Sequence, residues 1–310
     1  MSFDKLIGNE KIKSILKESI KNDNILHSYL FYGTDGIGKK LFALDFAKMI
    51  LCNNKNDRPC GKCKSCIEFD TKNNPDFFLI EPDGNSIKID QIRQMQKNIL
   101  EKPINSSKKV YIIDNSDTMT KEAQNCLLKT LEEPQEFIVI ILISSNENNI
   151  LATVKSRCTK MYFHKLTDVS LKTFINEKFN NINLDENMLK LCDGSISKSI
   201  KVIEKISILN QIESIVDAFD VTNELNIINQ NEVFYNNKDD INLLLDYMYI
   251  LLFEKINTNI VNKNNYINAI EFVQEAKNKL SNINNYDMTI DNMLTKIWRE
   301  INEKNYRGKI

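Results

Sequence analysis

An alternation of strand-like and helical segments in the first half of the chain constrains the fold most strongly. Nearly continuous apolar runs, typical of strands buried on both faces, occupy residues 28–33, 76–82, 108–115, 136–145 and 160–166. Helical patterns lie between them, at residues 38–52, 88–100 and 120–134. Strands without polar alternation need cover on both faces, so this order predicts a parallel sheet with helices on each side.

The second half of the chain has a different pattern. All five prolines lie at or before Pro134, and the only glycines after it are Gly194 and Gly308. Apolar residues then recur at helical spacing, in segments such as DDINLLLDYMYILLFEKI, and the stretch 195–219 reads as one longer or broken helix. We expect an α/β domain over 1–165, a small helical domain over 166–208 and an all-α domain over 209–310.

Composition excludes some classes of protein. The 310 residues include 41 basic and 42 acidic side chains, so charge alone does not favour broad binding to nucleic acid or membranes. The longest apolar run, FIVIILI, is far shorter than a bilayer span. The first residues lack the segments of a secretory signal. We therefore expect a cytoplasmic protein with no membrane partner.

The sequence GTDGIGKK follows the first expected strand and opens a helix, as a phosphate-binding loop does. Gly33, Gly36 and Gly38 supply the flexible turn, and Lys39 is placed to reach the outer phosphates of a nucleotide such as ATP or ADP. Lys40 stands where Ser or Thr would bind magnesium. A structural turn is the alternative interpretation of so short a pattern.

The expected strand 108–115 places an acidic residue at its carboxyl end, where ligand crevices of parallel sheets lie. Asp114 is thus a candidate for ordering a magnesium shell, although it could simply turn the chain. Asn115 follows it, and a neutral amide cannot act as the base that activates water. Because Lys40 and Asn115 both depart from the hydrolytic pattern, the sequence indicates a nucleotide site that has lost hydrolysis.

Four of the seven cysteines are close together in sequence, and they are Cys52, Cys60, Cys63 and Cys66. Two C-x2-C steps and a fourth thiol eight residues upstream can surround a tetrahedral ion, and zinc is the expected one. Four thiolates leave no open position, so the role would be structural. An iron–sulfur cluster or free thiols are the alternatives.

The run AQNCLLKTLEEPQEFIVIILISSNENNILATVKSRC (123–158) resembles the clamp-loader branch of the AAA+ ATPases, which carry LLKTLEEP and SRC motifs. FDKLIGNEKI, HSYLFYG, the four-cysteine insert and NPDFFLIEPDGNSIKIDQIR agree with it. The resemblance is dense over 1–165 and rests only on helical character after about 210. It implies a P-loop domain with a zinc module at about 52–66, a helical lid over 166–208 and a helical collar over 209–310.

Within this family, IEPDG followed by SIKIDQIR is similar to the delta-prime type rather than to the gamma/tau motor type. Motor members usually have a sensor arginine where Ser197 stands, and an earlier sensor position falls on Ser145. The intact SRC motif implies that Arg157 acts in trans, as an arginine finger near the γ-phosphate of a neighbouring subunit.

The resemblance thus implies a largely non-hydrolysing stator in a hetero-pentameric ring. Its partners would be motor (gamma/tau-type) and delta-type subunits, the sliding clamp and primed DNA. A catalytically active motor-type ATPase is the main alternative, favoured by intact Lys39 and Asp114. A small-molecule kinase would explain neither LLKTLEEP nor SRC. A zinc-dependent DNA-binding protein would need basic and aromatic residues around the cysteines.

Overall fold

The computed structural model describes residues 3, 6–179, 182, 184–220, 227, 230–258, 263–280 and 285–307. The chain forms two compact units. The first comprises Met1–Lys178 together with Gly194–Ser197, and the second comprises Phe179–Asp193 and Lys198–Ile310. The domain boundaries expected at 165/166 and 208/209 stay predictions.

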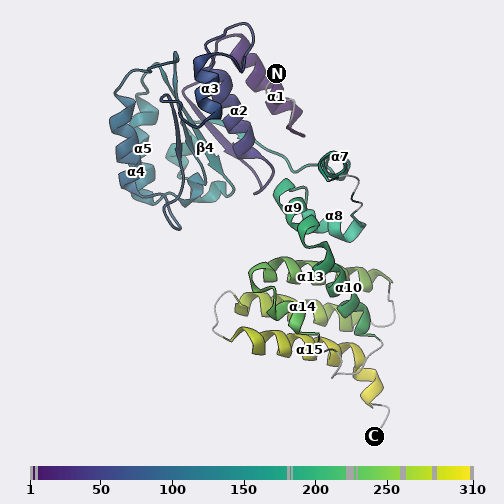
Figure 1. The fold of residues 1–310 in the computed structure, drawn as a ribbon. Helices are drawn as coiled ribbons and strands as arrows, with labels where there is room; N and C mark the ends of the chain where they lie inside the picture. The colour runs from purple at the N-terminus through teal and green to yellow at the C-terminus, as the bar shows by residue number, and fades with distance from the viewer. Residues whose placement is uncertain are drawn as a thin grey trace. The chain divides into compact units, whose positions relative to one another are not determined.

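The first unit is built on a five-stranded, wholly parallel sheet, which confirms the predicted architecture (Figure 1). Its spatial order is β2-β3-β4-β1-β5. The strands are β1 (Ser28–Tyr32), β2 (Phe77–Ile80), β3 (Lys109–Ile113), β4 (Ile138–Ser144) and β5 (Thr159–Tyr162). β3 and β4 are buried along their whole length, as their unbroken apolar sequences predict.

Helices cover both faces of this sheet (Figure 1). On one face lie α1 (Glu10–Lys21) and α2 (Lys39–Leu51), which enclose a core with the side chains of Phe31 and Ile141. On the other lie α4 (Ile89–Ile99), α5 (Lys121–Glu132) and α6 (Ala152–Lys155), whose core includes Tyr111. The unit also contains α3 (Lys64–Asp70), α7 (Asp168–Lys178) and the 3-10 turns η1 (Ser116–Thr118) and η2 (Glu147–Asn149).

The second unit is helical in the part that the structure describes, as the sequence pattern predicts. Its elements are α8 (Glu186–Cys192), most of α9 (Ile196–Glu204), α10 (Ile206–Ala218), α12 (Glu232–Tyr235), η3 (Lys238–Asp240), α13 (Ile241–Thr258), α14 (Lys263–Leu280) and α15 (Tyr286–Arg307). α14 packs between α13 and α15 (Figure 1). The stretch expected as one longer or broken helix is broken at Lys205.

None of the helices in the described ranges is both long and apolar enough to cross a bilayer.

Candidate functional site

The loop between β1 and α2 lies at the carboxyl end of the sheet, and its glycines are needed for two close approaches. A Cβ on Gly33 would lie 2.4 Å from the carbonyl oxygen of Phe163, and one on Gly36 would lie 2.3 Å from the Ser195 Oγ. Gly36 and Gly38 also have positive φ angles of 73° and 94°. The glycine pattern therefore follows from backbone geometry as well as from any bound phosphate.

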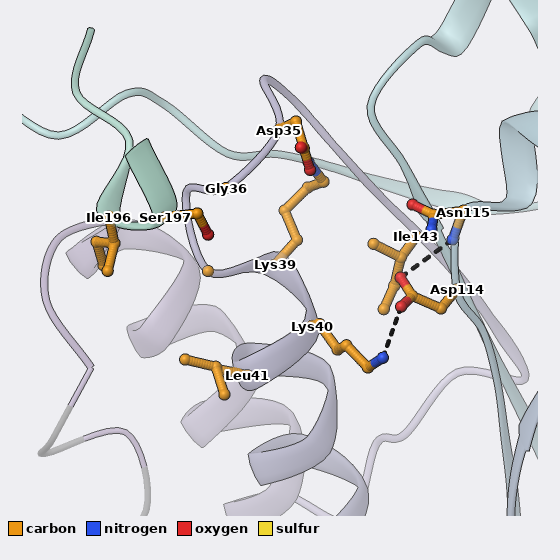
Figure 2. Close-up of a pocket in the computed structure, with 11 residues that line it drawn as sticks. Asp35, Gly36, Lys39, Lys40, Leu41, Asp114, Asn115, Ile143, Ile196 and Ser197 are labelled. Atoms are coloured by element: carbon orange, nitrogen blue, oxygen red, sulfur yellow. Dashed lines mark hydrogen bonds and ion pairs between the residues drawn. The ribbon is translucent and has the colours of Figure 1, made fainter. Parts of the chain in front are cut away.

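A cavity of about 340 Å³ opens beside this loop (Figure 2). It is lined by Asp35, Gly36, Gly38, Lys39, Lys40, Leu41, Asp114, Asn115, Ile143, Ile196 and Ser197. Its volume lies within the range of small-ligand sites. The structure thus brings together most of the residues that the sequence assigned to a nucleotide site.

Lys39 is turned toward its own loop. Its Nζ donates hydrogen bonds to the carbonyl oxygens of Gly33 and Thr34, each at 2.7 Å, and the residue is only 5% exposed. Burial lowers the pKa of Lys39, while the charges of Asp35, Asp117 and Asp114 oppose that shift. The side chain lines the cavity at the position where the sequence predicts phosphate contact.

The contacts of Lys40 with two carboxylates determine whether a metal ion can bind at this site. Its Nζ lies 2.9 Å from the Asp114 Oδ2 and 2.6 Å from the Glu81 Oε1. Burial lowers the pKa of Lys40, but the hydrogen bonds and charges of the two carboxylates outweigh that effect and raise it. The other oxygen of Asp114 accepts the backbone N–H of Asn115 at 3.0 Å (Figure 2).

Magnesium does not fit this arrangement. It requires oxygen ligands at about 2.0–2.1 Å in octahedral geometry. Lys40 supplies an ammonium where the motif would supply a hydroxyl, and this ammonium already contacts the carboxylate that would order the magnesium shell. The residues present therefore form an internal ion pair at the position where the motif predicts a metal.

Of the other predicted positions, Asn115 and Ser197 line the cavity and Ser145 does not. Asn115 lines the cavity and has a left-handed backbone, with φ of 49°. Ser197 also lines it, and its backbone N–H donates to the carbonyl oxygen of Gly36 at 3.1 Å. Ser145 is exposed and is not among the lining residues, although its N–H donates to the Asp117 Oδ1 at 3.2 Å.

Arg157 lies at the edge of the sheet formed by the amino ends of the strands, whereas the loop lies at their carboxyl ends. It precedes β5, and its carbonyl oxygen accepts a hydrogen bond from the Oγ of Ser28, the first residue of β1. The loop follows the last residue of the same strand. The five residues of β1 span four steps of about 3.3 Å, which separate its two ends by roughly 13 Å. Arg157 is therefore at the edge of the sheet away from the cavity of its own chain.

The guanidinium of Arg157 is held by two contacts. Its Nη2 lies 2.6 Å from the Glu132 Oε1, and its Nη1 donates to the Thr153 carbonyl oxygen at 2.8 Å. The side chain is 34% exposed. Glu132 belongs to the LLKTLEEP motif, so this ion pair joins the two sequence motifs that carry the family resemblance.

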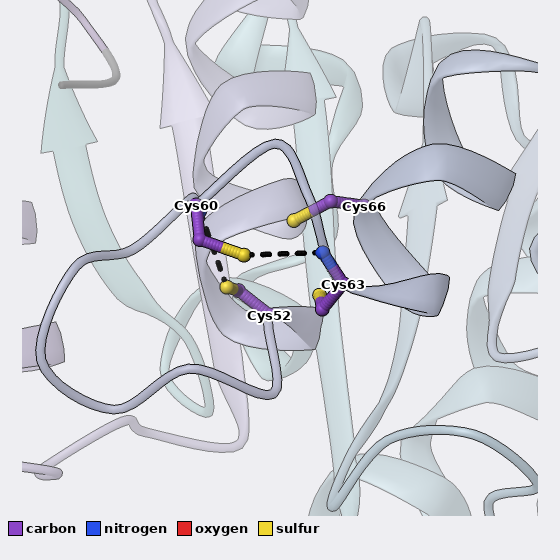
Figure 3. Close-up of side chains that lie close together, drawn as sticks. All are labelled: Cys52, Cys60, Cys63 and Cys66. Carbon is purple, nitrogen blue, oxygen red and sulfur yellow. Dashed lines mark hydrogen bonds between the residues drawn. The ribbon is translucent and has the colours of Figure 1, made fainter.

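The four clustered cysteines converge as predicted (Figure 3). Their Sγ atoms all lie within 4.8 Å of one another. Tetrahedral zinc–sulfur bonds of about 2.3 Å would need sulfur–sulfur separations of roughly 3.8 Å, which this cluster can meet with small adjustments. The residues therefore fit a structural metal ion.

Backbone N–H groups already point at two of these sulfurs. The N–H of Cys60 donates to the Cys52 Sγ at 3.4 Å, and the N–H of Cys63 donates to the Cys60 Sγ at 3.3 Å. The N–H groups of Lys62 and Cys63 lower the pKa of Cys60 to about 6. Burial raises the pKa of Cys52 and Cys66. The donors favour sulfur in its thiolate form, which is the form that binds metals.

Two residues of the site were missed by reasoning from sequence alone. Glu81 is 41 residues from Lys40, and only the meeting of β2 with the start of α2 brings the pair together. Glu132 lies within the LLKTLEEP motif, which could have drawn attention to it. Nothing in the sequence, however, indicated that it would pair with Arg157.

Comparisons with known proteins agree with these features. A model of the family described as "DNA polymerase III, delta subunit" matches residues 8–167. The delta' subunit of Bacillus subtilis is 37% identical over 168 residues, which are 54% of this chain and 51% of that protein. The delta' subunit of Pseudomonas aeruginosa is 36% identical over 141 residues, 43% of this chain and 42% of that one.

Gamma/tau subunits are also similar. The gamma/tau subunit of Mycoplasma genitalium is 30% identical over 319 residues, which cover 95% of this chain and 50% of that protein. The chain thus spans about half the length of the curated relatives that it matches, or less. The family match covers more than half of the chain, and delta' relatives have the higher identities. The chain therefore belongs to the DNA polymerase III delta subunit family, as a clamp-loader subunit of the delta-prime type.

Proposed function

We propose that this chain is a largely non-hydrolysing stator of a clamp-loader ring and supplies Arg157 in trans to a neighbouring ATPase subunit. The ring would be hetero-pentameric and would contain motor (gamma/tau-type) and delta-type subunits. It would place the sliding clamp on primed DNA during replication, in the cytoplasm. The chain itself would supply a correctly positioned charge, that of Arg157, and would not hydrolyse ATP.

The observation that carries this proposal furthest is the position of Arg157. It lies at the edge of the sheet away from the chain's own cavity, roughly 13 Å along β1 by strand geometry. A guanidinium so placed can serve phosphoryl transfer only at a nucleotide held by another subunit. Its permanent charge and planar donors suit it to stabilise the charge that develops on a transferred phosphoryl group.

The chain's own cavity supports the absence of hydrolysis. Lys40 pairs with Asp114, and Asn115 has no group that could accept a proton from water. The glycines and Lys39 still form a phosphate-type cradle, so ATP or ADP could occupy it without being consumed. Asp114, Asn115 and Ser145 would then be remnants of the catalytic and sensor positions.

The cysteine cluster and the helical regions have structural roles in this proposal. Zinc is the metal that four thiolates in a closed tetrahedral set favour. Residues 166–208 would form the lid and 209–310 the collar that joins the subunits. The packed helices α13, α14 and α15 support a helical bundle in the second of these regions.

A motor-type ATPase is the second candidate, because a gamma/tau subunit matches 95% of this chain and Lys39 and Asp114 are intact. Turnover separates the two proposals. ATP hydrolysis would be measured for the chain alone and for its cognate motor subunits with clamp and primed DNA, with this chain added as wild type, Arg157→Ala or Arg93→Ala. Arg93 is a matched control, since it is 60% exposed and forms an ion pair with nearby Asp90.

The stator proposal expects no turnover by the chain alone. Stimulation of the motor subunits should be retained with Arg93→Ala and largely lost with Arg157→Ala, because arginine fingers contribute about 10³–10⁵ in rate in related phosphoryl transfers. Turnover by the isolated chain that disappears with Lys39→Ala would establish the motor reading instead. Equal stimulation by wild type and Arg157→Ala would exclude a role in trans.

A further inference from the structure

Lys40 joins three separate elements of the first unit. It stands in the first turn of α2, while Glu81 follows the last residue of β2 and Asp114 follows the last residue of β3. The ammonium lies within 3 Å of an oxygen of each carboxylate. The side chain therefore connects the helix of the phosphate-type loop to the carboxyl ends of two neighbouring strands.

The burial of Asp114 makes this connection important for the local structure. Its side chain is 11% exposed, and its carboxylate contacts the Lys40 ammonium and the backbone N–H of Asn115. A buried carboxylate without a compensating cation is costly. In a loop of this kind, the divalent cation that binds with the nucleotide would normally supply that compensation.

We propose that the Lys40 ammonium is a built-in replacement for the divalent cation, so that the junction between loop, helix and strands forms without Mg²⁺ and without nucleotide. The inference stands independently of any role of Arg157 in trans. It follows from the pairing of one fixed cation with Asp114, whose buried carboxylate needs a compensating cation, and with the half-exposed Glu81. It makes the shape of this subunit's loop insensitive to the ligands that reshape a working phosphate loop.

Hydrogen–deuterium exchange of the full chain tests the inference at the junction itself. The amides of residues 33–42 would be followed for wild type, Lys40→Met, Asp114→Asn and the double variant, in EDTA and in Mg²⁺. The wild type should exchange equally in both. Lys40→Met should exchange roughly tenfold faster, because it leaves Asp114 buried and unpaired. The double variant should exchange more slowly than expected if the effects of the two single variants simply added, because a neutral Asn needs no cation.

Lys48→Met is the matched control. It removes a lysine from the same helix and breaks a pair with Asp70 at 2.5 Å, but lies away from the loop. It should leave exchange at residues 33–42 unchanged. An effect as large as that of Lys40→Met would attribute the result to general loosening of α2 and would overturn the proposal.

Lys40→Thr tests the replacement of the ion directly, because it restores the hydroxyl that the motif predicts. With ATP present throughout, its loop should exchange fast in EDTA and should regain protection with Mg²⁺, while the wild type shows no dependence on Mg²⁺. Wild-type protection that rises several-fold on adding Mg²⁺ would refute the inference. So would a Lys40→Thr loop that fails to respond, because the ammonium and the divalent cation would then not be interchangeable.

Discussion

Removing the metal should loosen the segment between the cysteines while leaving α3 in place. The perturbation is chelation, or Cys63→Ser, which removes one of the four sulfur ligands. Residues 53–63 form most of the loop that the cluster closes, and the cluster links its two ends. We expect this loop to open locally, because a metal bound by the four sulfurs would hold its ends together.

The helix α3 has anchors that do not involve the metal. The Nδ2 of Asn74 donates to the carbonyl oxygen and the Oγ of Ser65, at 2.9 and 2.8 Å. The Ser65 Oγ lies 3.0 Å from that of Ser106, and the rings of Phe69 and Phe77 lie 4.6 Å apart. Three hydrogen bonds at about 0.5–1.5 kcal/mol and one aromatic pair at about 0.5–1.5 kcal/mol give roughly 2–6 kcal/mol.

That stabilisation predicts a clear difference in exchange rates. Because 1.4 kcal/mol corresponds to a factor of about 10, residues 64–70 should stay protected by a factor of at least about 30 after metal loss, while residues 53–63 lose protection. Hydrogen exchange before and after chelation measures both segments in one experiment. Cys126→Ser is the matched control, because this cysteine is outside the cluster, and it should change neither segment.

Two outcomes would refute the reasoning. Cooperative loss of protection across α3 and the sheet would mean that the metal, and not the Ser65 contacts, holds this part of the fold. Unchanged exchange in residues 53–63 would mean that the loop is closed by something other than the cluster.

Two further predictions concern the loop and the arginine. Gly36→Ala should destabilise the first unit by about 1–3 kcal/mol, since φ is +73° and the new Cβ would meet the Ser195 Oγ, and thermal unfolding with the midpoint lowered by several degrees would show it. Glu132→Gln should reduce stimulation of the motor subunits by less than about fivefold, because a half-exposed ion pair is worth roughly 0.2–1 kcal/mol. A loss as large as that of Arg157→Ala would instead make Glu132 indispensable for positioning the guanidinium.

The strands could be predicted from sequence because burial on both faces leaves a direct signature. β4 is buried at every position, and its sequence IVIILIS has no polar alternation to confuse the pattern. The break at Lys205 was harder, since apolar residues continue at helical spacing on both sides of it. Local sequence does not encode the point at which tertiary packing bends a helix.

Only those features of the candidate site that follow from the chemistry of single residues could be predicted from the sequence. Lys40 could be excluded as a magnesium ligand from its side chain alone, but its partner Glu81 could not be found, because their contact depends on the spatial order of the strands. The cysteines were easier, since short spacing along the chain already limits how far apart four thiols can lie. Contacts between residues of different strands can be identified only once the fold is known.

The two ends of the parallel strands differ in a way that is consistent with the proposed stationary role. At the carboxyl edge, the Lys40 ammonium pairs with the buried carboxylate of Asp114 and the half-exposed carboxylate of Glu81. At the amino edge, Arg157 remains one-third exposed and is held by a half-exposed glutamate that a stronger anion can outcompete. A phosphate group on an adjacent subunit is such an anion. In the proposed stator, the chain thus combines a nucleotide-type site whose buried carboxylate already has a cation with an arginine whose present partner a neighbouring subunit could displace.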